Sequence, residues 1–88
     1  MNKVALVYQK NTNRNYVCLL PKDNKQVEIL DTVTFRAGII TSKGNVIDIK
    51  EFDEDAFLFL MHCLNIEFYD EMPKIISVDK YEFIDWGN

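Results

Sequence analysis

Few side chains in this chain of 88 residues have the chemistry for nucleophilic or acid–base catalysis. The single histidine, His62, is followed directly by Cys63, but neighbours on a helix project about 100° apart and do not meet as base and nucleophile. Cys18 is far from Cys63 in sequence and no secretory context is evident, which predicts reduced thiols rather than a disulfide. Ser42 and Ser77 lack the setting of a nucleophile elbow. We therefore expect no catalytic residue and no enzyme.

Carboxylates cluster over residues 48–55, and oxygen-rich clusters are the material of Mg²⁺ and Ca²⁺ sites. Asp53, Glu54 and Asp55 stand directly before a helical apolar pattern, where capping and the helix dipole account for them. The run also lacks the central glycine and the distant glutamate of a calcium-binding loop. The three glycines are isolated from one another, so no phosphate-binding loop is predicted. We expect no metal and no cofactor.

Charge is divided unevenly along the chain. The first 47 residues carry seven cations against three carboxylates, net +4, and the rest carry three against eleven, net -8. In the basic half Tyr8, Lys10, Arg14 and Tyr16 flank a predicted turn, and strands bearing cations and aromatic rings bind single-stranded nucleic acid in small barrels. A nucleic-acid or nucleotide site on this hairpin is the alternative function, although a pI near 4.8 is unlike the basic domains usual for such binders.

The acidic half is the main candidate for a binding surface. A helix packed on one sheet buries only one face, so apolar residues on its other faces need a cover. That cover is a partner protein, a second copy of the chain, or the chain's own C-terminal residues. An apolar centre with a charged rim is the usual anatomy of a protein interface, and carboxylates favour a basic partner. The predicted interaction residues are Asp53, Glu54, Asp55, Phe59, Ile66, Tyr69, Asp70 and Glu71.

Apolar residues alternate with period two in the first half, which predicts strands. Residues 4–8 and 16–20 alternate on either side of a polar turn and predict a first hairpin. A long strand, bent near Asp31, is expected over residues 27–35. A second hairpin is expected to turn at residues 42–45, whose glycine supplies a positive φ.

The periodicity changes after Asp53, which predicts one main helix near residues 53–64 with this aspartate as its N-cap. Residues 66–71 fit a strand or more helix equally well, and the choice stays open. A strand is expected at residues 75–78 and a docked aromatic C-terminus at residues 81–86. The core-facing stripe of the helix consists of Phe57, Leu60, Met61, Leu64 and Phe68.

These elements predict a single α+β domain over residues 1–88, with an antiparallel sheet of about five strands, one main helix and a docked β/aromatic C-terminus. The longest apolar run falls far short of the roughly 20 residues that a membrane-spanning helix needs, and no signal-peptide pattern opens the chain. We expect a cytoplasmic protein that does not enter membranes.

The function that these features favour is a small, acidic, non-enzymatic protein-interaction module. Its expected partner is another protein with a basic surface, and a homodimer is a second form of partnership. Eight lysines against two arginines, beside abundant asparagine and isoleucine, are typical of AT-rich bacterial and phage genomes. In general character the chain resembles the accessory proteins by which phages and mobile elements inhibit a host or defence protein, which implies an inhibitor.

Overall fold

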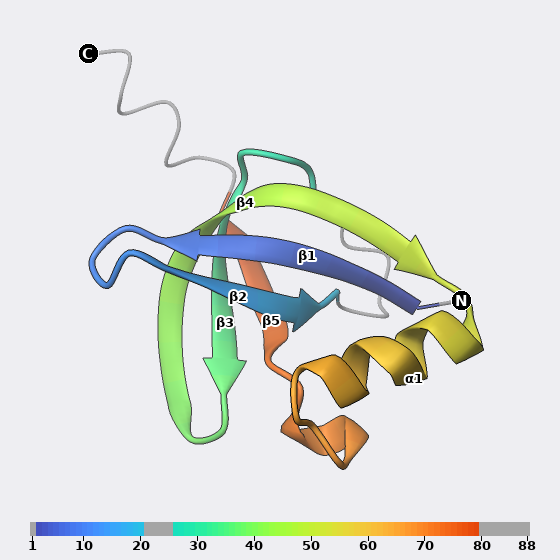
Figure 1. Cartoon of the computed structure of the whole chain (residues 1–88). Helices are drawn as coiled ribbons and strands as arrows, with labels where there is room; N and C mark the ends of the chain where they lie inside the picture. The colour runs from blue at the N-terminus through green and yellow to red at the C-terminus, as the bar shows by residue number, and fades with distance from the viewer. Residues whose placement is uncertain (1, 21–25, 80–88) are drawn as a thin grey trace, which may run out of the picture.

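The computed structural model describes residues 2–20 and 26–79. Five strands close into a barrel in the order β1-β2-β5-β3-β4, and one helix lies against the outside of the barrel wall (Figure 1). The chain is an α+β fold, as predicted. The elements are β1 (Asn2–Gln9), β2 (Arg14–Leu19), β3 (Thr32–Ala37), β4 (Ile40–Phe52), α1 (Glu54–Cys63), the 3₁₀ helix η1 (Tyr69–Glu71) and β5 (Lys74–Asp79).

One pair of neighbouring strands is parallel in a sheet that is otherwise antiparallel, as predicted. β2 and β5 pair in parallel at Leu19 and Lys74 alone, whereas the other four neighbouring pairs are antiparallel. The physical reason is the odd number of strands. In a closed ring of five strands the directions cannot alternate all the way round, so at least one neighbouring pair has to be parallel.

The first hairpin forms where the sequence predicts it. β1 pairs with β2 from Val4 opposite Leu19 to Gln9 opposite Arg14. The turn between the strands places Asn13 in the left-handed region at φ 54°, and the Tyr8 hydroxyl donates to Asn13 Oδ1 over 2.9 Å. An asparagine tolerates this backbone conformation better than most residues, which suits it to the turn.

The second hairpin turns at a different place from the one predicted. The chain reverses between β3 and β4 at Gly38, whose φ is +65°, and not at residues 42–45. Gly44 lies inside β4, where a Cβ would come within 2.6 Å of Val7 Cγ1 and 2.7 Å of the Tyr8 carbonyl oxygen. This glycine therefore permits the close approach of β1 and β4 and does not form a turn.

The predicted long strand over residues 27–35 is wrong in its first half. The backbone turns before β3: Asp31 Oδ2 accepts from the Glu28 N–H at 2.8 Å, and the Asp31 N–H donates to the Glu28 carbonyl at 3.1 Å. Leu30 lies in the left-handed region at φ 80°. Asp31, expected as a bend within a strand, is thus a buried residue that closes a tight turn.

Alternation along the strands builds two separate cores. The barrel interior holds Ala5, Val7, Cys18, Val27, Val33, Phe35, Val46 and Ile75. The second core lies outside the wall, beneath α1, and holds Val4, Leu19, Phe57, Met61 and Met72. β1 serves both, because its successive side chains point to opposite faces and are apolar on each.

Helix α1 begins as predicted, with Asp53 Oδ1 accepting from the Ala56 N–H at 2.8 Å. Its predicted stripe is buried in the middle, at Phe57 and Met61, but Phe68 beyond the end of the helix is 63% exposed. The chain leaves the helix through Asn65 in the left-handed region at φ 57°.

Residues 66–71, left open between helix and strand, form an irregular segment followed by η1. β5 covers the predicted strand at residues 75–78, and the predicted docking of residues 81–86 lies outside the described residues. No helix within the described parts of the chain is long and apolar enough to cross a membrane.

A candidate protein-binding groove

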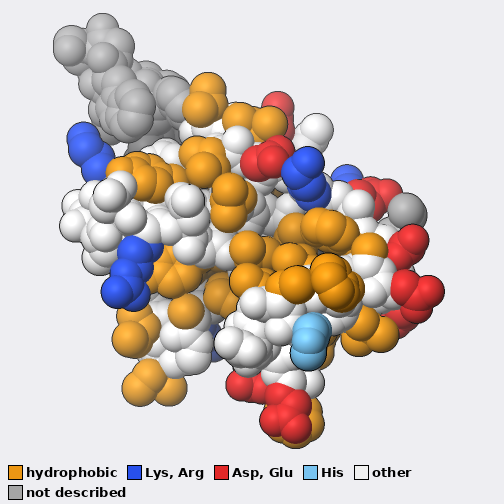
Figure 2. Space-filling model, viewed as in Figure 1, with side chains coloured by type: hydrophobic (Ala, Val, Ile, Leu, Met, Phe, Trp, Pro, Cys, Tyr) orange, Lys and Arg blue, Asp and Glu red, His pale blue; other side chains and the backbone are white. Residues whose placement is uncertain are grey.

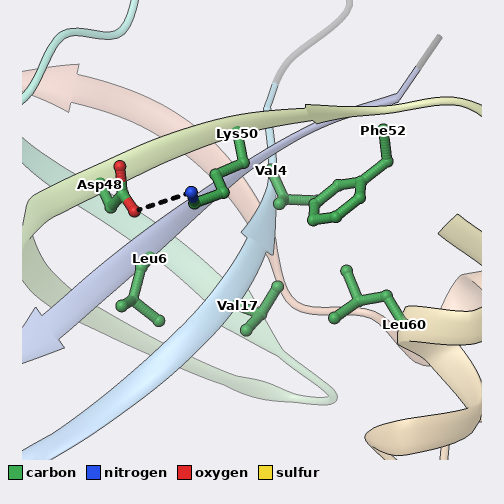
Figure 3. A pocket seen from close by; sticks show the side chains of 7 residues that line it. All are labelled: Val4, Leu6, Val17, Asp48, Lys50, Phe52 and Leu60. Atoms are coloured by element: carbon green, nitrogen blue, oxygen red, sulfur yellow. Dashed lines mark ion pairs between the residues drawn. The ribbon is translucent and has the colours of Figure 1, made fainter. Parts of the chain in front are cut away.

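An apolar groove of about 150 Å³ lies on the outer wall of the barrel, beside α1. Three strands and the helix meet there, and their side chains converge on the hollow from different sides (Figure 3). It is lined by Val4, Leu6, Val17, Asp48, Lys50, Phe52 and Leu60.

The strands place these side chains by alternation. Val4 and Leu6 point outward from β1, while Ala5 and Val7 between and beyond them point into the barrel. Leu6 is paired with Val17 of β2, so the two side chains are cross-strand neighbours on the groove floor. The helix covers Val4 but leaves Leu6 half-buried, and the groove results from this incomplete cover.

The charged side chains at the groove are matched to each other. Lys50 Nζ lies 4.0 Å from Asp48 Oδ2 on the rim, whereas the Lys3–Glu51 pair, at 3.9 Å, lies by alternation on the opposite face of the same strands. Both pairs are largely exposed, so their stabilising effect is small. The Lys50–Asp48 pair gives the groove a rim without net charge around an apolar floor.

The apolar surface continues from the groove over the helix. At about 100° per residue, Leu60 at the groove edge and Phe59 on the outer face are joined by Ala56 and Cys63, which project between them. Phe59 is 68% exposed and Leu58 is 57% exposed. Figure 2 shows hydrophobic side chains gathered over α1 and the adjoining strands. Contiguous exposed apolar surface of this kind marks interaction sites.

Two of the predicted interaction carboxylates hold the backbone. Asp53 caps α1, and Glu71 Oε1 accepts from the Phe68 N–H at 2.8 Å at the start of η1. Glu54, Asp55 and Asp70 are exposed. Among the described residues, the side chains of these three carboxylates make no hydrogen bond or ion pair that holds the fold.

The predicted apolar members do not share one face. Tyr69 packs its ring 5.9 Å from that of Phe57, and Lys74 Nζ lies 5.7 Å from the Tyr69 ring centre. Ile66 is half-buried against the core beneath the helix. Phe59 projects about 200° from Phe57, so it lies on the opposite side of α1 from Tyr69 and belongs with the groove surface instead.

The residues of the alternative nucleic-acid site are also divided. Tyr16 pairs with Val7 and points into the barrel, where its ring lies 4.9 Å from that of Phe35. Tyr8 points to the outer face and donates to Asn13. The two rings therefore form no common stacking platform, because cross-strand parity puts them on opposite faces.

The cations of that site remain at the exposed turn. Lys10 and Arg14 are exposed, and Lys10 lines a polar hollow of about 190 Å³ at one end of the barrel. The hollow is lined by Gln9, Lys10, Asn11, Thr32, Lys43, Gly44 and Asn45. Its amides and lysines could receive an anionic ligand.

The thiols have contrasting environments. Cys18 is fully buried in the barrel, and burial raises the pKa of its thiol to about 12, so it stays protonated at neutral pH. Cys63 is a free, exposed cysteine on α1. Within residues 2–20 and 26–79, no group of three or more His, Cys, Asp or Glu side chains is placed to hold a metal ion.

The groove was missed by sequence reasoning, although a signal for it exists. Residues 4–7 are apolar without interruption, a pattern typical of a strand that buries both faces. The outer face therefore needed an apolar cover, and the ten-residue helix is too short to cover all of it. Protein-family models, curated proteins and solved structures were compared with this chain, and none matches it.

Proposed function

We propose that the chain is a non-enzymatic protein-interaction module whose groove receives an apolar side chain of a partner protein. The observation that carries the proposal is the groove itself, an apolar hollow bounded by Leu6, Val17 and Leu60 and continuous with the exposed Phe59. Binding energy at protein interfaces concentrates where an apolar anchor enters a desolvated pocket, and the ion-paired rim supplies polar surroundings for such an anchor.

The expected partner carries a basic surface around its apolar anchor. Glu54 and Asp55 are exposed in the first turn of α1, on the same helix as Phe59. Cations of a partner approaching the helix would meet these carboxylates at the edge of the apolar surface, which raises the association rate. Asp53 and Glu71 contribute through the backbone that they hold in place.

An inhibitor of a host or defence protein, of the kind that phages and mobile elements encode, is one form of this role. Such a protein needs no chemistry of its own, because occupying a partner's functional surface is sufficient. A cytoplasmic location belongs to the same proposal, and the two free cysteines support it since thiols persist in reducing compartments. Addition of the purified chain to its captured partner would show inhibition as lost partner activity.

The test fills the groove without opening a cavity. Leu6→Trp places a larger side chain on the half-buried groove floor, and Ile39→Ala, at a hairpin position that is 99% exposed, is the matched control. Each variant is used to capture partners from a lysate, and the affinity of the captured protein is measured by surface plasmon resonance. We expect Leu6→Trp to weaken binding at least about tenfold, the loss of one anchor contact, and Ile39→Ala to leave it unchanged. Equal affinities for folded variants would refute the groove as the site.

A nucleic-acid or nucleotide binder remains the second candidate, and the polar hollow with Lys10 and Lys43 favours it. Fluorescence anisotropy with labelled single-stranded DNA and RNA tests this function at low and physiological salt. Binding that weakens with salt and is lost in the Lys10→Ala, Arg14→Ala double variant supports it. An anisotropy that does not rise at low salt would exclude it.

A further inference from the structure

Among the described residues, part of β2 has no strand partner on the side that faces away from β1. Leu20 N donates to the Lys3 carbonyl on β1 at 3.3 Å, whereas Leu19 N donates to the Pro73 carbonyl on the opposite side at 2.8 Å. Backbone groups alternate sides along a strand, so the N–H and C=O groups of Asn15 and Val17 point away from β1, as those of Leu19 do. Within the described residues no strand pairs with them on that side.

The chemistry of proline explains why β5 does not fill this edge. Extending the parallel ladder from Leu19 toward Val17 would require the N–H of Pro73 to donate to the Val17 carbonyl. Proline has no N–H, and the preceding residues turn away into η1. The pairing between β2 and β5 therefore does not extend from Leu19 toward Val17, and Asn15 and Val17 form a short edge with no strand partner among the described residues.

Residues 14–17 carry few of the side-chain devices that protect an edge against pairing. Exposed edges are usually blunted by a proline, an inward charge or a bulge. Residues 14–17 contain no proline, no bulge interrupts their pairing with β1, and Arg14, the one charged residue of β2, lies at its very start. An edge whose donors and acceptors have no strand partner among residues 2–20 and 26–79, and which carries no such device, is suited to accept a strand.

We propose that the edge is occupied by β2 of a second copy, in an antiparallel pair about a two-fold axis at Tyr16. Asn15 of each copy then faces Val17 of the other, in two hydrogen-bonded pairs that each exchange both N–H···O bonds. The occupant must be short, because the free stretch is bounded by the turn at Asn13 and by Pro73. β2 itself is six residues long and begins directly after that same turn.

Charge and shape agree with self-pairing. The two-fold axis keeps the Arg14 side chains four residue steps apart along the strands, roughly 14 Å, beyond the screening length in physiological salt. Val17 lines the apolar groove, so pairing brings the groove of each copy to the border between the two molecules. The dimer does not depend on what the groove binds.

The test removes one outward N–H and leaves the β1 ladder intact. Asn15→Pro deletes the edge donor at a position where proline is tolerated, because the N–H of an edge residue makes no ladder bond. Asn15→Ala keeps the N–H and is the matched control. Sedimentation velocity of the full chain from about 10 μM to 1 mM should show wild type and Asn15→Ala forming dimers. Asn15→Pro should dimerise about 100-fold more weakly, since each copy loses a bond worth about tenfold.

Amide hydrogen exchange of the wild-type chain gives a second measurement that requires no variant. Val17 N–H should exchange more slowly as the concentration rises, while Tyr16 N–H, in the ladder with Val7, should be protected at every concentration. A chain that stays monomeric to 1 mM overturns the proposal. So does a dimer as strong in folded Asn15→Pro as in wild type, or a Val17 amide that gains protection only when another protein is added.

Discussion

Cys18 and Cys63 show how strongly the position of one side chain in the fold sets its chemistry. Cys18 lies inside the barrel with no exposed surface, and its pKa is raised to about 12 because burial disfavours the thiolate. Cys63 is exposed near the end of α1. The same functional group is thus inert at one site and accessible at the other.

A thiol reagent should label one cysteine in the native protein and two in denaturant, because only the exposed Cys63 thiol is accessible until unfolding releases Cys18. Ellman's reagent at pH 8 measures both counts, and Cys63→Ser is the control that should abolish native labelling. Rapid reaction of two thiols in the folded chain would contradict the burial of Cys18.

The raised pKa of Cys18 also predicts a pH dependence of stability. The unfolded thiol loses its proton near pH 8.5, whereas the folded one keeps it to about 12. Stability from this group is therefore complete below about pH 8.5 and declines as the pH rises above it, because the unfolded state then binds fewer protons. Urea titrations of the chain and of Cys18→Ala between pH 7 and 10 should show a decline in wild type that the variant lacks.

Gly44 is required for space, and Gly38 for its backbone angle. A Cβ at Gly44 would meet the Tyr8 carbonyl, a backbone atom that cannot easily yield, whereas no atom lies within 4 Å of a Cβ at Gly38. We expect Gly44→Ala to cost about 1–3 kcal/mol and Gly38→Ala about 1–2 kcal/mol. Asparagine should restore part of the loss at Gly38 and deepen it at Gly44, as judged by urea denaturation. The same response to asparagine at both positions would contradict the distinction between a steric requirement at Gly44 and a positive φ at Gly38.

Prediction from sequence works at the residue scale where a side chain acts locally. Asp53 is predictable as a cap because it precedes an apolar helical pattern. Glu71 acts in the same way, but η1 spans only three residues and leaves no periodicity to detect. The inward position of Tyr16 is not predictable, because alternation defines two faces of a strand without showing which one is inside.

At the scale of elements, α1 is defined by one buried face. Met61 is buried beneath the helix while Leu58 is 57% exposed. We expect Met61→Ala to cost about 2–5 kcal/mol through the cavity that it leaves, and Leu58→Ala to cost under about 1 kcal/mol. Denaturant midpoints of the two variants provide the comparison. Equal losses would show that the outer face of the helix is covered in solution.

Elements were predictable where the pattern was regular over many residues. The first hairpin and α1 form where the periodicity of the sequence predicts them. β4, however, runs for thirteen residues through Gly44, and the sequence around this glycine predicts a turn. The true turn at Gly38 follows a strand directly and lacks the polar cluster that marked the first one. A tight backbone contact and a turn both favour glycine, and only the three-dimensional neighbours separate them.

At the scale of the whole molecule, the groove and the open edge depend on contacts that no local pattern encodes. Asn2 pairs with Phe52, and this long-range pairing brings β4 beside β1 and sets the helix over the wall. The number of strands was predictable from the sequence, whereas the order of the strands, and hence the surface left uncovered, depends on the register of distant segments.

The single residue pair that joins β2 to β5 has a consequence for how the chain folds. β1 with β2 and β3 with β4 are local hairpins that can form early, while β5 has to wait until β3 is in place, and its contact with β2 adds little. The transition state should therefore contain the hairpins and lack the last strand. In stopped-flow experiments Ile75→Val in β5 should speed unfolding and leave the folding rate nearly unchanged, whereas Val33→Ala in β3 should slow folding. The junction between β2 and β5 would then be the last part of the barrel to form and the first to open.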